Sequence, residues 1–334
     1  MFNRILIIQT AFIGDVILTT PLIEKLNRFY PESSIDILVK KGHESLIDNN
    51  PKINRVLSFD KNNRKYVNLI HIIKEIRKQK YDLAVNVQRY LTTGIITTLS
   101  GAKMTVGYAK NPLSFMFNRK VEHNIHHTSD KSEHEVIRNL KLIEEFTDGS
   151  FEMPKLYPSV ADFKKVEPTN PYYCIAPTSV LFTKEFPVDR WIELIQKLPS
   201  DSDIYLLGAP GDKVRCDDIV KKSRVGNITN LAGELSFLES AALMRGATMN
   251  FVNDSAPLHI ASSVNAPVRA IFCSTTPALG FTPLSDDSMV IETKRSLPCR
   301  PCGMTGKREC PEDHFLCSDI PVDDILETFS SANN

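Results

Sequence analysis

The sequence predicts an α/β protein made of two doubly wound domains in series. Short β-branched runs alternate with longer amphipathic runs, which is typical of βαβ units around a parallel sheet. This series occurs twice, with a proline-rich stretch at residues 152–172 between the two halves. The chain has 334 residues, 42% of them hydrophobic, which is more apolar material than one core of usual size needs. We therefore divide it into residues 1–160, residues 161–320, and a C-terminal helix and tail at 321–334 that we expect to return toward the first domain.

In the first domain we expect five strands and four helices. The strands are predicted at residues 4–9, 34–39, 55–59, 82–87 and 104–107, and the helices at residues 15–29, 66–79, 92–100 and 132–146. In the second helix, Ile70, Ile73 and Ile76 form an apolar stripe that predicts a helix lying on a sheet. Its basic residues are expected to face water.

The second domain repeats the pattern after the linker. Prolines at positions 154, 158, 168 and 171 exclude a regular helix or sheet ladder in the linker. Strands are predicted at residues 172–176, 203–207, 247–253 and 268–272, and helices at residues 188–198, 211–222, 236–245, 256–264 and 322–329.

Charge is balanced over the whole chain but uneven along it. The chain has 40 Lys and Arg and 40 Asp and Glu, whereas residues 1–160 alone hold 23 basic and 17 acidic residues. A basic half suits an anionic partner such as a phosphorylated glycolipid or an acidic membrane surface, and it equally fits an uneven scatter of solvated charges. Nucleic acid would call for a denser basic stripe, so we expect no nucleic-acid partner. No apolar run approaches the roughly 20 residues that span a bilayer, which favours a soluble or peripheral protein.

The seven cysteines fall into two groups. Three lie singly in apolar or helical contexts, which favours a reducing compartment: Cys174, Cys216 and Cys273. The other four, Cys299, Cys302, Cys310 and Cys317, lie close together in an irregular segment. Four clustered thiols suggest a structural zinc site. Because the second pair lacks CxxC spacing, free thiols or disulfides remain open alternatives.

The loop after the first strand offers a carboxylate, Asp15, at a strand-to-helix turn. In open α/β sheets such loops line the ligand site, and a carboxylate there can take a proton from an acceptor hydroxyl. Asp15 equally suits capping of the helix that follows. The loop has only Gly14 and no GxGxxG pattern, so a nicotinamide oxidoreductase is poorly supported.

Two loops of the second domain suit a diphosphate. Thr178 and Ser179 follow a strand and Lys184 comes soon after; a lysine can neutralise charge on a leaving group, although one lysine in a surface loop is often only solvated. Asp254 and Ser255 begin a helix whose free amides and dipole can hold phosphate or sugar hydroxyls. Capping alone also explains these residue types, and His259, one turn later, fits a packed histidine.

Four segments, in this order and spacing, resemble the ADP-heptose:lipopolysaccharide heptosyltransferases of glycosyltransferase family 9, and in particular heptosyltransferase II: RILIIQTAFIGDVILTTPLI, TKEFPVDRW, NDSAPLHIASSVNAPV and CRPCGMTGKRECPEDHFLC. The resemblance covers nearly the whole chain. It implies a GT-B fold, with two Rossmann-like domains facing each other across a cleft. It further implies inverting, metal-independent transfer of heptose from ADP-heptose to the lipopolysaccharide inner core, with no cofactor required.

The resemblance also implies roles for individual residues. Asp15 falls on the catalytic aspartate, and Gly14, Gln88 and Arg89 lie on the acceptor side. The donor-binding positions are Thr178, Ser179, Lys184, Glu234, Asp254, Ser255, Ala256 and His259. Relatives usually have glycine in place of Ala256, and a methyl group there bears on the identity of the donor. The acceptor implied is lipid A–Kdo or a heptosylated core, reached from the cytoplasm by a protein peripheral to the inner face of the inner membrane.

Other functions remain open on the sequence. A GT-B transferase acting on another nucleotide sugar or glycan would share these motifs, and so would a non-catalytic nucleotide-sugar binding module. A donor screen separates the first alternative, and ADP release excludes the second. Several residues of the first domain could meet phosphates and lipid at a membrane, or form an ordinary wet surface: Lys61, Arg64, Lys65, Phe115, Phe117, Arg119 and Lys120.

Overall fold

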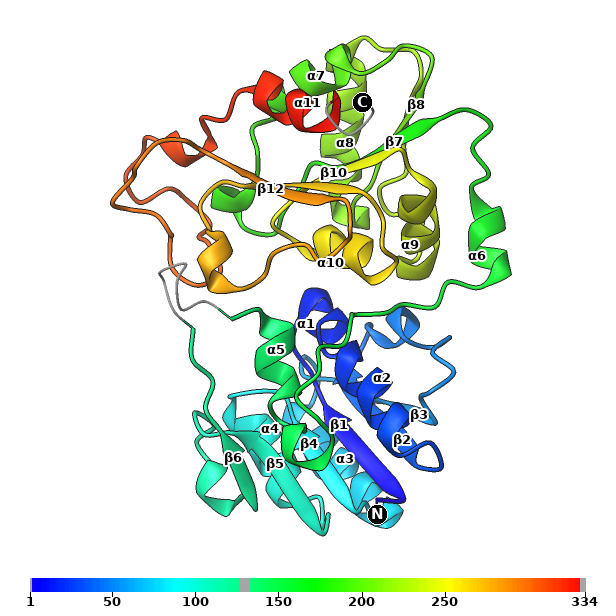
Figure 1. Ribbon diagram of the computed structural model, residues 1–334, viewed down its shortest axis with the longest axis vertical. Coiled ribbons are helices and arrows are strands. Elements are labelled where there is room, and N and C mark those ends of the chain that lie inside the picture. Colours follow the sequence, from blue (N-terminus) through cyan, green and yellow to red (C-terminus); the bar gives the residue numbers. More distant parts are fainter. Residues whose placement is uncertain (1, 126–132, 331–334) are drawn as a thin grey trace. The chain divides into compact units, whose positions relative to one another are not determined.

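The computed structural model describes residues 2–125 and 133–330, and these fold into two compact units. Residues 2–125 and 133–157 form the N-terminal unit, and residues 158–330 form the C-terminal unit. Each contains one six-stranded sheet in which every neighbouring pair of strands is parallel, with helices on both faces (Figure 1). The predicted α/β class with two doubly wound sheets is confirmed. Within the described ranges, no helix is both long and apolar enough to cross a bilayer.

The sheet of the N-terminal unit has the order β3-β2-β1-β4-β5-β6. Its strands are β1 (Arg4–Ile8), β2 (Ser34–Lys40), β3 (Arg55–Phe59), β4 (Leu83–Asn86), β5 (Met104–Tyr108) and β6 (Arg119–Val121), and its helices are α1 (Ile13–Ile17), α2 (Thr20–Phe29), α3 (Lys65–Gln79), α4 (Leu91–Thr98) and α5 (Glu135–Leu140). All five predicted strands are confirmed. The sixth, β6, was not predicted because its three residues include two exposed cations and give no apolar alternation.

The helix predicted at residues 15–29 is two helices, α1 and α2. Pro21, in the first turn of α2, has no N–H to donate to the Ile17 carbonyl, so one continuous helix would lose a hydrogen bond there. Side chains satisfy the freed carbonyls instead. Thr20 Oγ1 donates to the Ile17 oxygen over 2.7 Å, and Thr19 Oγ1 donates to the Asp15 oxygen over 2.8 Å.

The predicted inward stripe of α3 is partly wrong. Ile76 is fully buried and Ile73 packs beside it, but Ile70 is 53% exposed. The buried side is completed by Leu69 and Ile72, because at 100° per residue these two positions lie closer to the Ile73–Ile76 side than Ile70 does. In Figure 1, α3 and α4 lie behind the sheet and α2 and α5 in front. Ile70 lies on the side of α3 that faces away from the sheet, so its side chain is exposed to solvent.

The sheet of the C-terminal unit has the order β12-β11-β10-β7-β8-β9. Its strands are β7 (Tyr172–Ala176), β8 (Asp203–Leu206), β9 (Ile228–Asn230), β10 (Met249–Asn253), β11 (Val268–Phe272) and β12 (Ser288–Glu292), and its helices are α6 (Val160–Lys165), α7 (Val188–Lys197), α8 (Lys213–Ser223), α9 (Phe237–Gly246), α10 (Ala256–Ser263) and α11 (Val322–Ser330). The prediction missed both outer strands, β9 and β12, and the short helix α6. Ser159 and Asp162 cap α6 reciprocally, and this capping box stabilises a short helix between the linker prolines Pro158 and Pro168.

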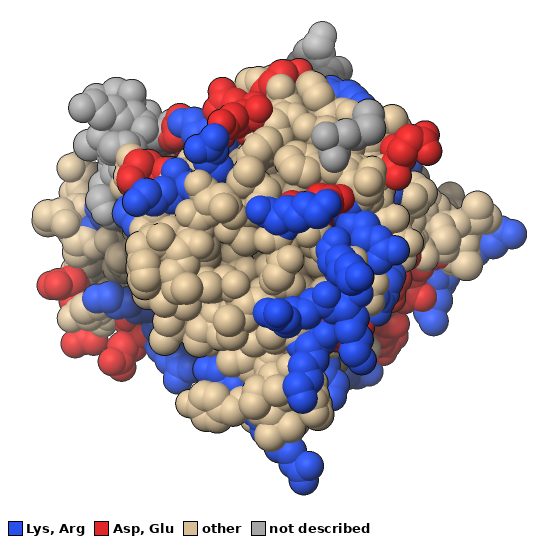
Figure 2. Space-filling model, turned by 90° about the horizontal axis from the view of Figure 1, so that it is seen from below, with Lys and Arg blue, Asp and Glu red and all other residues tan. Residues whose placement is uncertain are grey.

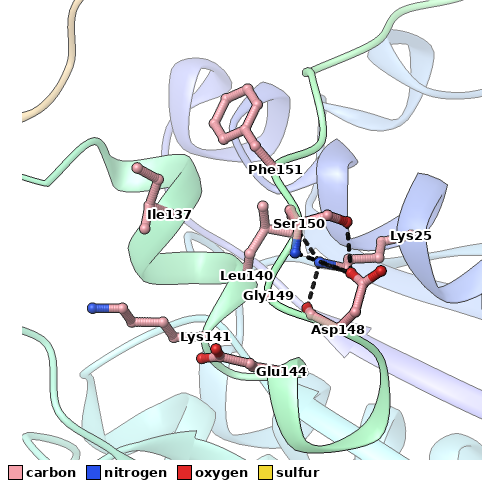
Figure 3. A pocket seen from close by; sticks show the side chains of 9 residues that line it. All are labelled: Lys25, Ile137, Leu140, Lys141, Glu144, Asp148, Gly149, Ser150 and Phe151. Atoms are coloured by element: carbon pink, nitrogen blue, oxygen red, sulfur yellow. Dashed lines mark hydrogen bonds and ion pairs between the residues drawn. The ribbon is translucent and has the colours of Figure 1, made fainter.

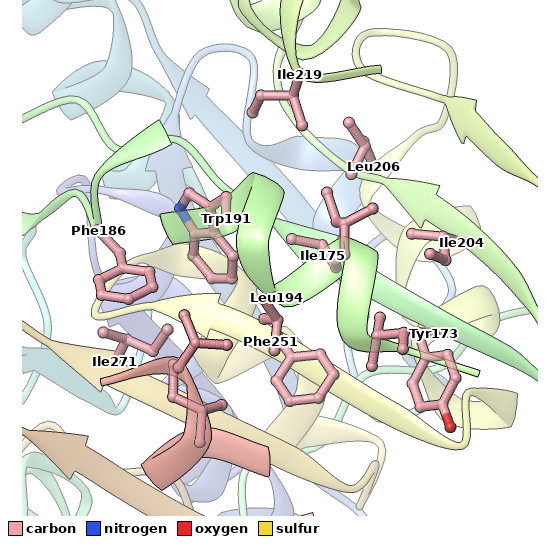
Figure 4. Close-up of a cluster of buried hydrophobic side chains, with 14 of the residues drawn as sticks. Tyr173, Ile175, Phe186, Trp191, Leu194, Ile204, Leu206, Ile219, Phe251 and Ile271 are labelled. Carbon is pink, nitrogen blue, oxygen red and sulfur yellow. The ribbon is translucent and has the colours of Figure 1, made fainter. Parts of the chain in front are cut away.

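The core of the C-terminal unit forms where α7 packs on the sheet (Figure 4). Trp191 of α7 is completely buried and meets the ring of Phe186 edge to face, with centroids 5.3 Å apart. Leu194 of the same helix packs with Ile175 and Phe251 from the strands. Each such side chain contributes about 1.5–3 kcal/mol of transfer free energy, which fixes β7 and β10 and hence the loops that follow them.

The last helix, α11, packs against α7 and β12 of the C-terminal unit. Its buried residues Val322 and Ile325 join the core around Trp191. The helix predicted at residues 322–329 is thus confirmed, and the return of this segment toward the N-terminal unit stays a prediction.

A buried charged cluster anchors α5 in the N-terminal unit. Arg138 Nε donates to Glu135 Oε2 over 2.7 Å, and His123 Nε2 lies 3.2 Å from both carboxylate oxygens. The side chains of Arg138 and His123 are nearly inaccessible to solvent. Burial alone would raise the pKa of Glu135, but the His123 hydrogen bond and the Arg138 charge outweigh it and hold that pKa below its ordinary value.

We predict that Glu135→Gln destabilises the fold by about 3–5 kcal/mol at neutral pH, because it removes the negative charge that pairs with the buried Arg138. Since the pKa of Glu135 is lower in the folded state than in the unfolded state, its contribution is complete above the unfolded pKa. It is lost as the pH falls through the folded pKa. The difference in unfolding free energy between wild type and variant, from urea titrations, should therefore shrink at acid pH.

The matched control is Glu145→Gln, which breaks an exposed pair with Arg119 and should cost less than about 1 kcal/mol. Equal losses for the two variants at neutral pH would contradict a special role for the buried cluster.

Candidate functional site

In each sheet the strand order reverses at one point, and the loops beyond the carboxyl ends of the two strands there diverge to leave room for a ligand. The reversal lies between β1 and β4 in the N-terminal unit and between β7 and β10 in the C-terminal unit. The predicted acceptor-side residues follow β1 and β4, and most of the predicted donor-side residues follow β7 and β10. Each unit thus gathers its own set of site residues at its own reversal point.

In the N-terminal unit, Gln88 joins the two loops. Its Oε1 accepts hydrogen bonds from Thr10 Oγ1 (2.8 Å) and from the Thr10 N–H (3.2 Å), and its own N–H donates to Asn86 Oδ1. Only 4% of Gln88 is exposed. Its role in the structure is to hold the loop after β1 in place, whereas its neighbour Arg89 is exposed.

Asp15 lies in the first turn of α1 and is half-buried. Its Oδ2 accepts a hydrogen bond from the Phe12 N–H over 3.1 Å, and Gly14, beside it, accepts the Leu18 N–H through its carbonyl oxygen. Asp15 therefore does cap a helix, but the short α1 rather than the long helix expected. This hydrogen bond fixes the orientation of the Asp15 carboxylate within the loop that Gln88 holds in place.

Lys61 adds a positive charge to the same loops. Its Nζ donates to the Thr10 carbonyl oxygen over 2.7 Å. Burial lowers the pKa of Lys61, and the nearby charges of Lys40 and Lys65 lower it further. The sequence indicated Lys61 only as a surface cation, and the fold brings it to the Asp15 loop.

In the C-terminal unit, Lys184 and Asp254 form an ion pair. Lys184 Nζ lies 2.8 Å from Asp254 Oδ2, and both side chains are largely buried, at 16% and 7% exposed. The hydroxyl of Thr275, in the loop after β11, donates to the same carboxylate oxygen over 2.6 Å. The sequence analysis missed Thr275. Its signal was a run of hydroxyl residues, 274–276, directly after a buried strand.

A second buried carboxylate, Glu185, orders the loop after β7. It accepts the Ser179 N–H over 2.7 Å and a two-pronged hydrogen bond from Arg215 over 2.7 and 2.6 Å. Asn253 completes the link between loops, because its side chain accepts the Phe186 N–H and donates to the Ala176 carbonyl oxygen. Thr178 is buried in the same loop.

The start of α10 lies directly after Asp254. The Ser255 hydroxyl is 3.5 Å from the Asn253 carbonyl oxygen, Ala256 is the first helical residue, and both are half-buried. His259 is buried in the same helix, with its ring 6.5 Å from that of Phe281, as expected of a packed histidine. Glu234 lies farther away, after β9, where it pairs with Lys213 over 2.9 Å.

The cysteine-rich segment braces the lysine loop. Arg300 donates to the carbonyl oxygen of Phe272, the last residue of β11, and to those of Cys273 and Thr275 in the loop that follows. Farther along, Thr183 and Lys307 exchange backbone and side-chain hydrogen bonds of 2.8–3.2 Å. Gly306 lies so near that an added Cβ would be 2.8 Å from Lys184 Cγ. The segment thus fixes the base of the Lys184 side chain.

The four clustered cysteines are all free thiols. Within the described residues, no three or more His, Cys, Asp or Glu side chains are arranged to hold a metal ion, so the zinc alternative at Cys299, Cys302, Cys310 and Cys317 is not supported. Burial raises the pKa of Cys317 to about 11 and also raises that of Cys302. Burial therefore favours the neutral thiol form of both side chains.

A separate pocket of about 160 Å³ lies between α2, α5 and residues 144–151. Figure 3 shows Lys25 at its wall, with its Nζ bonded to Asp148 and Ser150. The Nζ lies 2.7 Å from Asp148 Oδ1 and donates to the Asp148 carbonyl oxygen over 2.6 Å. None of the predicted site residues lines this pocket.

Comparison with known proteins identifies the family. The family model described as glycosyltransferase family 9 (heptosyltransferase) matches residues 69–314. The chain belongs to glycosyltransferase family 9. It is therefore a glycosyltransferase of the GT-B fold class, with one Rossmann-like sheet in each unit.

Individual family 9 relatives match most of the chain. Lipopolysaccharide heptosyltransferase 3 of Escherichia coli is 28% identical over 279 residues, which cover 79% of this chain and 82% of that protein. A family 9 structure from Veillonella parvula matches with a TM-score of 0.83 at 19% identity, covering 98% of this chain and 96% of that one. The E. coli ADP-heptose lps heptosyltransferase II structure gives 0.78 at 17% identity, covering 99% and 100%.

We predict that Thr183→Val loosens the brace on Lys184. The buried hydroxyl accepts the Lys307 N–H and the Ser274 hydroxyl, and valine leaves those donors unsatisfied, which costs about 1–3 kcal/mol. Unfolding by urea should show the loss, and the amides near Lys307 should exchange faster with deuterium. Thr229→Val, at an exposed position of β9, is the control and should change neither. Unchanged exchange near Lys307 in Thr183→Val would contradict the brace.

Proposed function

We propose that this glycosyltransferase moves heptose from ADP-heptose onto the inner core of lipopolysaccharide, at the cytoplasmic face of the inner membrane. The acceptor is lipid A–Kdo or a core that already carries heptose. The names of the matching relatives support this substrate class. The observation that carries the proposal is the set of contacts between Lys184, Asp254 and Thr275 at the start of α10. These contacts position the Lys184 ammonium beside the N-terminus of that helix.

The donor diphosphate binds beside Lys184, at the N-terminus of α10. The ammonium of Lys184 has three N–H groups, so it can keep its bond to Asp254 and still donate to phosphate oxygens. Asp254 thereby holds the ammonium in position before the donor arrives. The backbone amides of Ser255 and Ala256 and the hydroxyls of Thr178 and Ser179 supply further donors. The adenosine lies against the loops near Gly208 and Glu234.

Asp15 acts as the general base on the acceptor. Its carboxylate takes the proton of an acceptor hydroxyl, whose oxygen attacks the anomeric carbon from the side opposite ADP. The bond from that carbon to the ADP oxygen breaks, its electron pair leaves with ADP, and configuration inverts. Lys184 and the dipole of α10 neutralise the charge that builds on the leaving group, so the proposed reaction needs no metal ion.

We predict that Asp15→Asn lowers kcat about 100- to 10,000-fold. Asparagine keeps an oxygen that can accept the Phe12 N–H, so the cap should persist while the base is lost. Transfer is followed by ADP release in the presence of a chelator, and ADP-heptose affinity, from calorimetry, should stay unchanged. Asp48→Asn, an exposed change in the same unit, should keep full activity. An Asp15→Asn enzyme as fast as wild type would remove Asp15 from this role.

We predict that Lys184→Ala weakens ADP-heptose binding about 10- to 100-fold, since a hydrogen bond to a charged group contributes about 1.5–3 kcal/mol. It should also slow transfer, because the lost charge acts on both ground and transition states. Lys222→Ala, which removes an exposed cation of α8, is the control.

The same calorimetry tests the identity of the donor. ADP-heptose, ADP-glucose and UDP-linked sugars are titrated into wild type and Lys184→Ala. The methyl group of Ala256 at the first residue of α10 is the feature that favours a different donor. Tighter binding of another nucleotide sugar would overturn the heptose proposal, and donor binding without ADP release would indicate a binding module.

A further inference from the structure

Helix α3 of the N-terminal unit has two unlike faces. Its inner face packs on the sheet through Leu69, Ile72, Ile73 and Ile76. Beside this face, on the side of the helix that meets solvent, Tyr66, Val67 and Ile70 are 78%, 47% and 53% exposed. At 100° per residue these three positions fall within one quarter to one third of the helix circumference. Three large apolar side chains grouped in water mark an interaction surface rather than ordinary scatter.

Basic side chains lie on the same exposed side of α3, nearer its C-terminal end. Lys74, Arg77 and Lys78 in the last turns are exposed and lie on the same side as Tyr66 and Ile70. We call these six residues, Tyr66, Val67, Ile70, Lys74, Arg77 and Lys78, the outer face of α3. The one acidic residue of the helix, Glu75, is paired with Arg55 over 2.6 Å. Within the described part of the chain, Lys74 and Lys78 form no ion pair.

The underside of the N-terminal unit is basic as well. Figure 2 shows Lys and Arg gathered in a broad band there, next to a largely uncharged area and with few Asp or Glu inside the band. Lys78 and Lys80, at the end of α3, are both exposed. Such a band attracts an extended anionic partner over roughly a Debye length.

The first turn of α3 lies near the proposed base. The helix follows β3, so it begins at the same carboxyl edge of the sheet as the loop that carries Asp15. Lys61, in the connection from β3 to α3, bonds the Thr10 carbonyl oxygen of the Asp15 loop over 2.7 Å. Whatever rests against the apolar end of α3 is therefore close to that loop.

We propose that the outer face of α3 rests on the surface of an anionic lipid bilayer, with the helix axis parallel to the membrane. The inference depends on the proposed function, in which the acceptor is lipid-linked. Apolar side chains of such a helix enter the boundary between headgroups and acyl chains, and each nearby Lys or Arg contributes about 1 kcal/mol of attraction to anionic lipid. Cations alone would suit any polyanion, and apolar residues alone would suit a protein. Their combination along one helix of about 22 Å fits a bilayer.

Flotation of the full-length protein tests the surface. The probes are vesicles of phosphatidylethanolamine with phosphatidylglycerol, and vesicles of phosphatidylcholine alone, at low and high salt. Wild type should float with the anionic vesicles at low salt. When it is mixed with the neutral vesicles, it should remain in the bottom fraction. Lys74→Glu with Lys78→Glu should weaken anionic binding about tenfold or more. Tyr66→Ser with Val67→Ser and Ile70→Ser should also weaken binding to the anionic vesicles at low salt, because the apolar contacts with the bilayer are lost.

Matched changes on α8 serve as controls. Val214 is 79% exposed, and Lys221 and Lys222 are exposed on the same helix. Val214→Ser and Lys221→Glu with Lys222→Glu should leave flotation unchanged. The proposal is overturned if wild type ignores anionic vesicles, or if the α3 and α8 variants lose binding equally.

A soluble, deacylated acceptor separates this inference from the proposed function. The α3 variants should transfer heptose to it at the wild-type rate and lose activity only on acceptor embedded in vesicles. An equal loss on both acceptors would overturn the membrane role of this face. Absence of transfer by wild type to either acceptor would instead count against the proposed function, and the flotation result would stand by itself.

Discussion

A parallel sheet covered by helices on both faces leaves only its edges for chemistry, and this constraint governs both units. The backbone groups of the strands are hydrogen-bonded to neighbouring strands. Their side chains are buried in the core, around residues such as Ile175 and Trp191. What remains is the set of loops beyond the carboxyl ends. Most of the candidate residues in this chain lie there because no other part of a doubly wound fold can present polar groups without breaking the core.

Those loops are held by buried side-chain hydrogen bonds rather than by regular structure. In the N-terminal unit Gln88 fixes the loop of Asp15 through Thr10. In the C-terminal unit Asn253 and Glu185 join the lysine loop to the ends of β7 and β10. Each of these groups is buried, so its hydrogen bonds cannot be exchanged cheaply for water. Buried polar residues thereby set the geometry of the loops that carry Asp15, the proposed base, and Lys184, the proposed phosphate-binding residue.

The cysteine-rich segment is best understood as part of that support. Its four cysteines are free, and burial raises the pKa of Cys302 and Cys317. Arg300 donates to three carbonyl oxygens at the end of β11 and just beyond it, and residues 306 and 307 lie against the lysine loop. The hydrogen bonds of Arg300 and of the Lys307 backbone therefore hold this segment against β11 and the lysine loop.

The sequence by itself determined the fold class and nine of the twelve strands found in residues 2–125 and 133–330, because buried parallel strands and the helices between them have strong periodicities. It also determined which loops carry carboxylates, hydroxyls and a lysine, since strand ends can be located from those periodicities. The tertiary structure decided what periodicity cannot encode. It supplied the outer strands β6, β9 and β12, of which β6 and β9 have only three residues each. It also turned Ile70 outward and brought Thr275 to Asp254 from a loop more than twenty residues away. Such contacts depend on which strands become neighbours in the sheet, and that order is fixed only when the whole core packs.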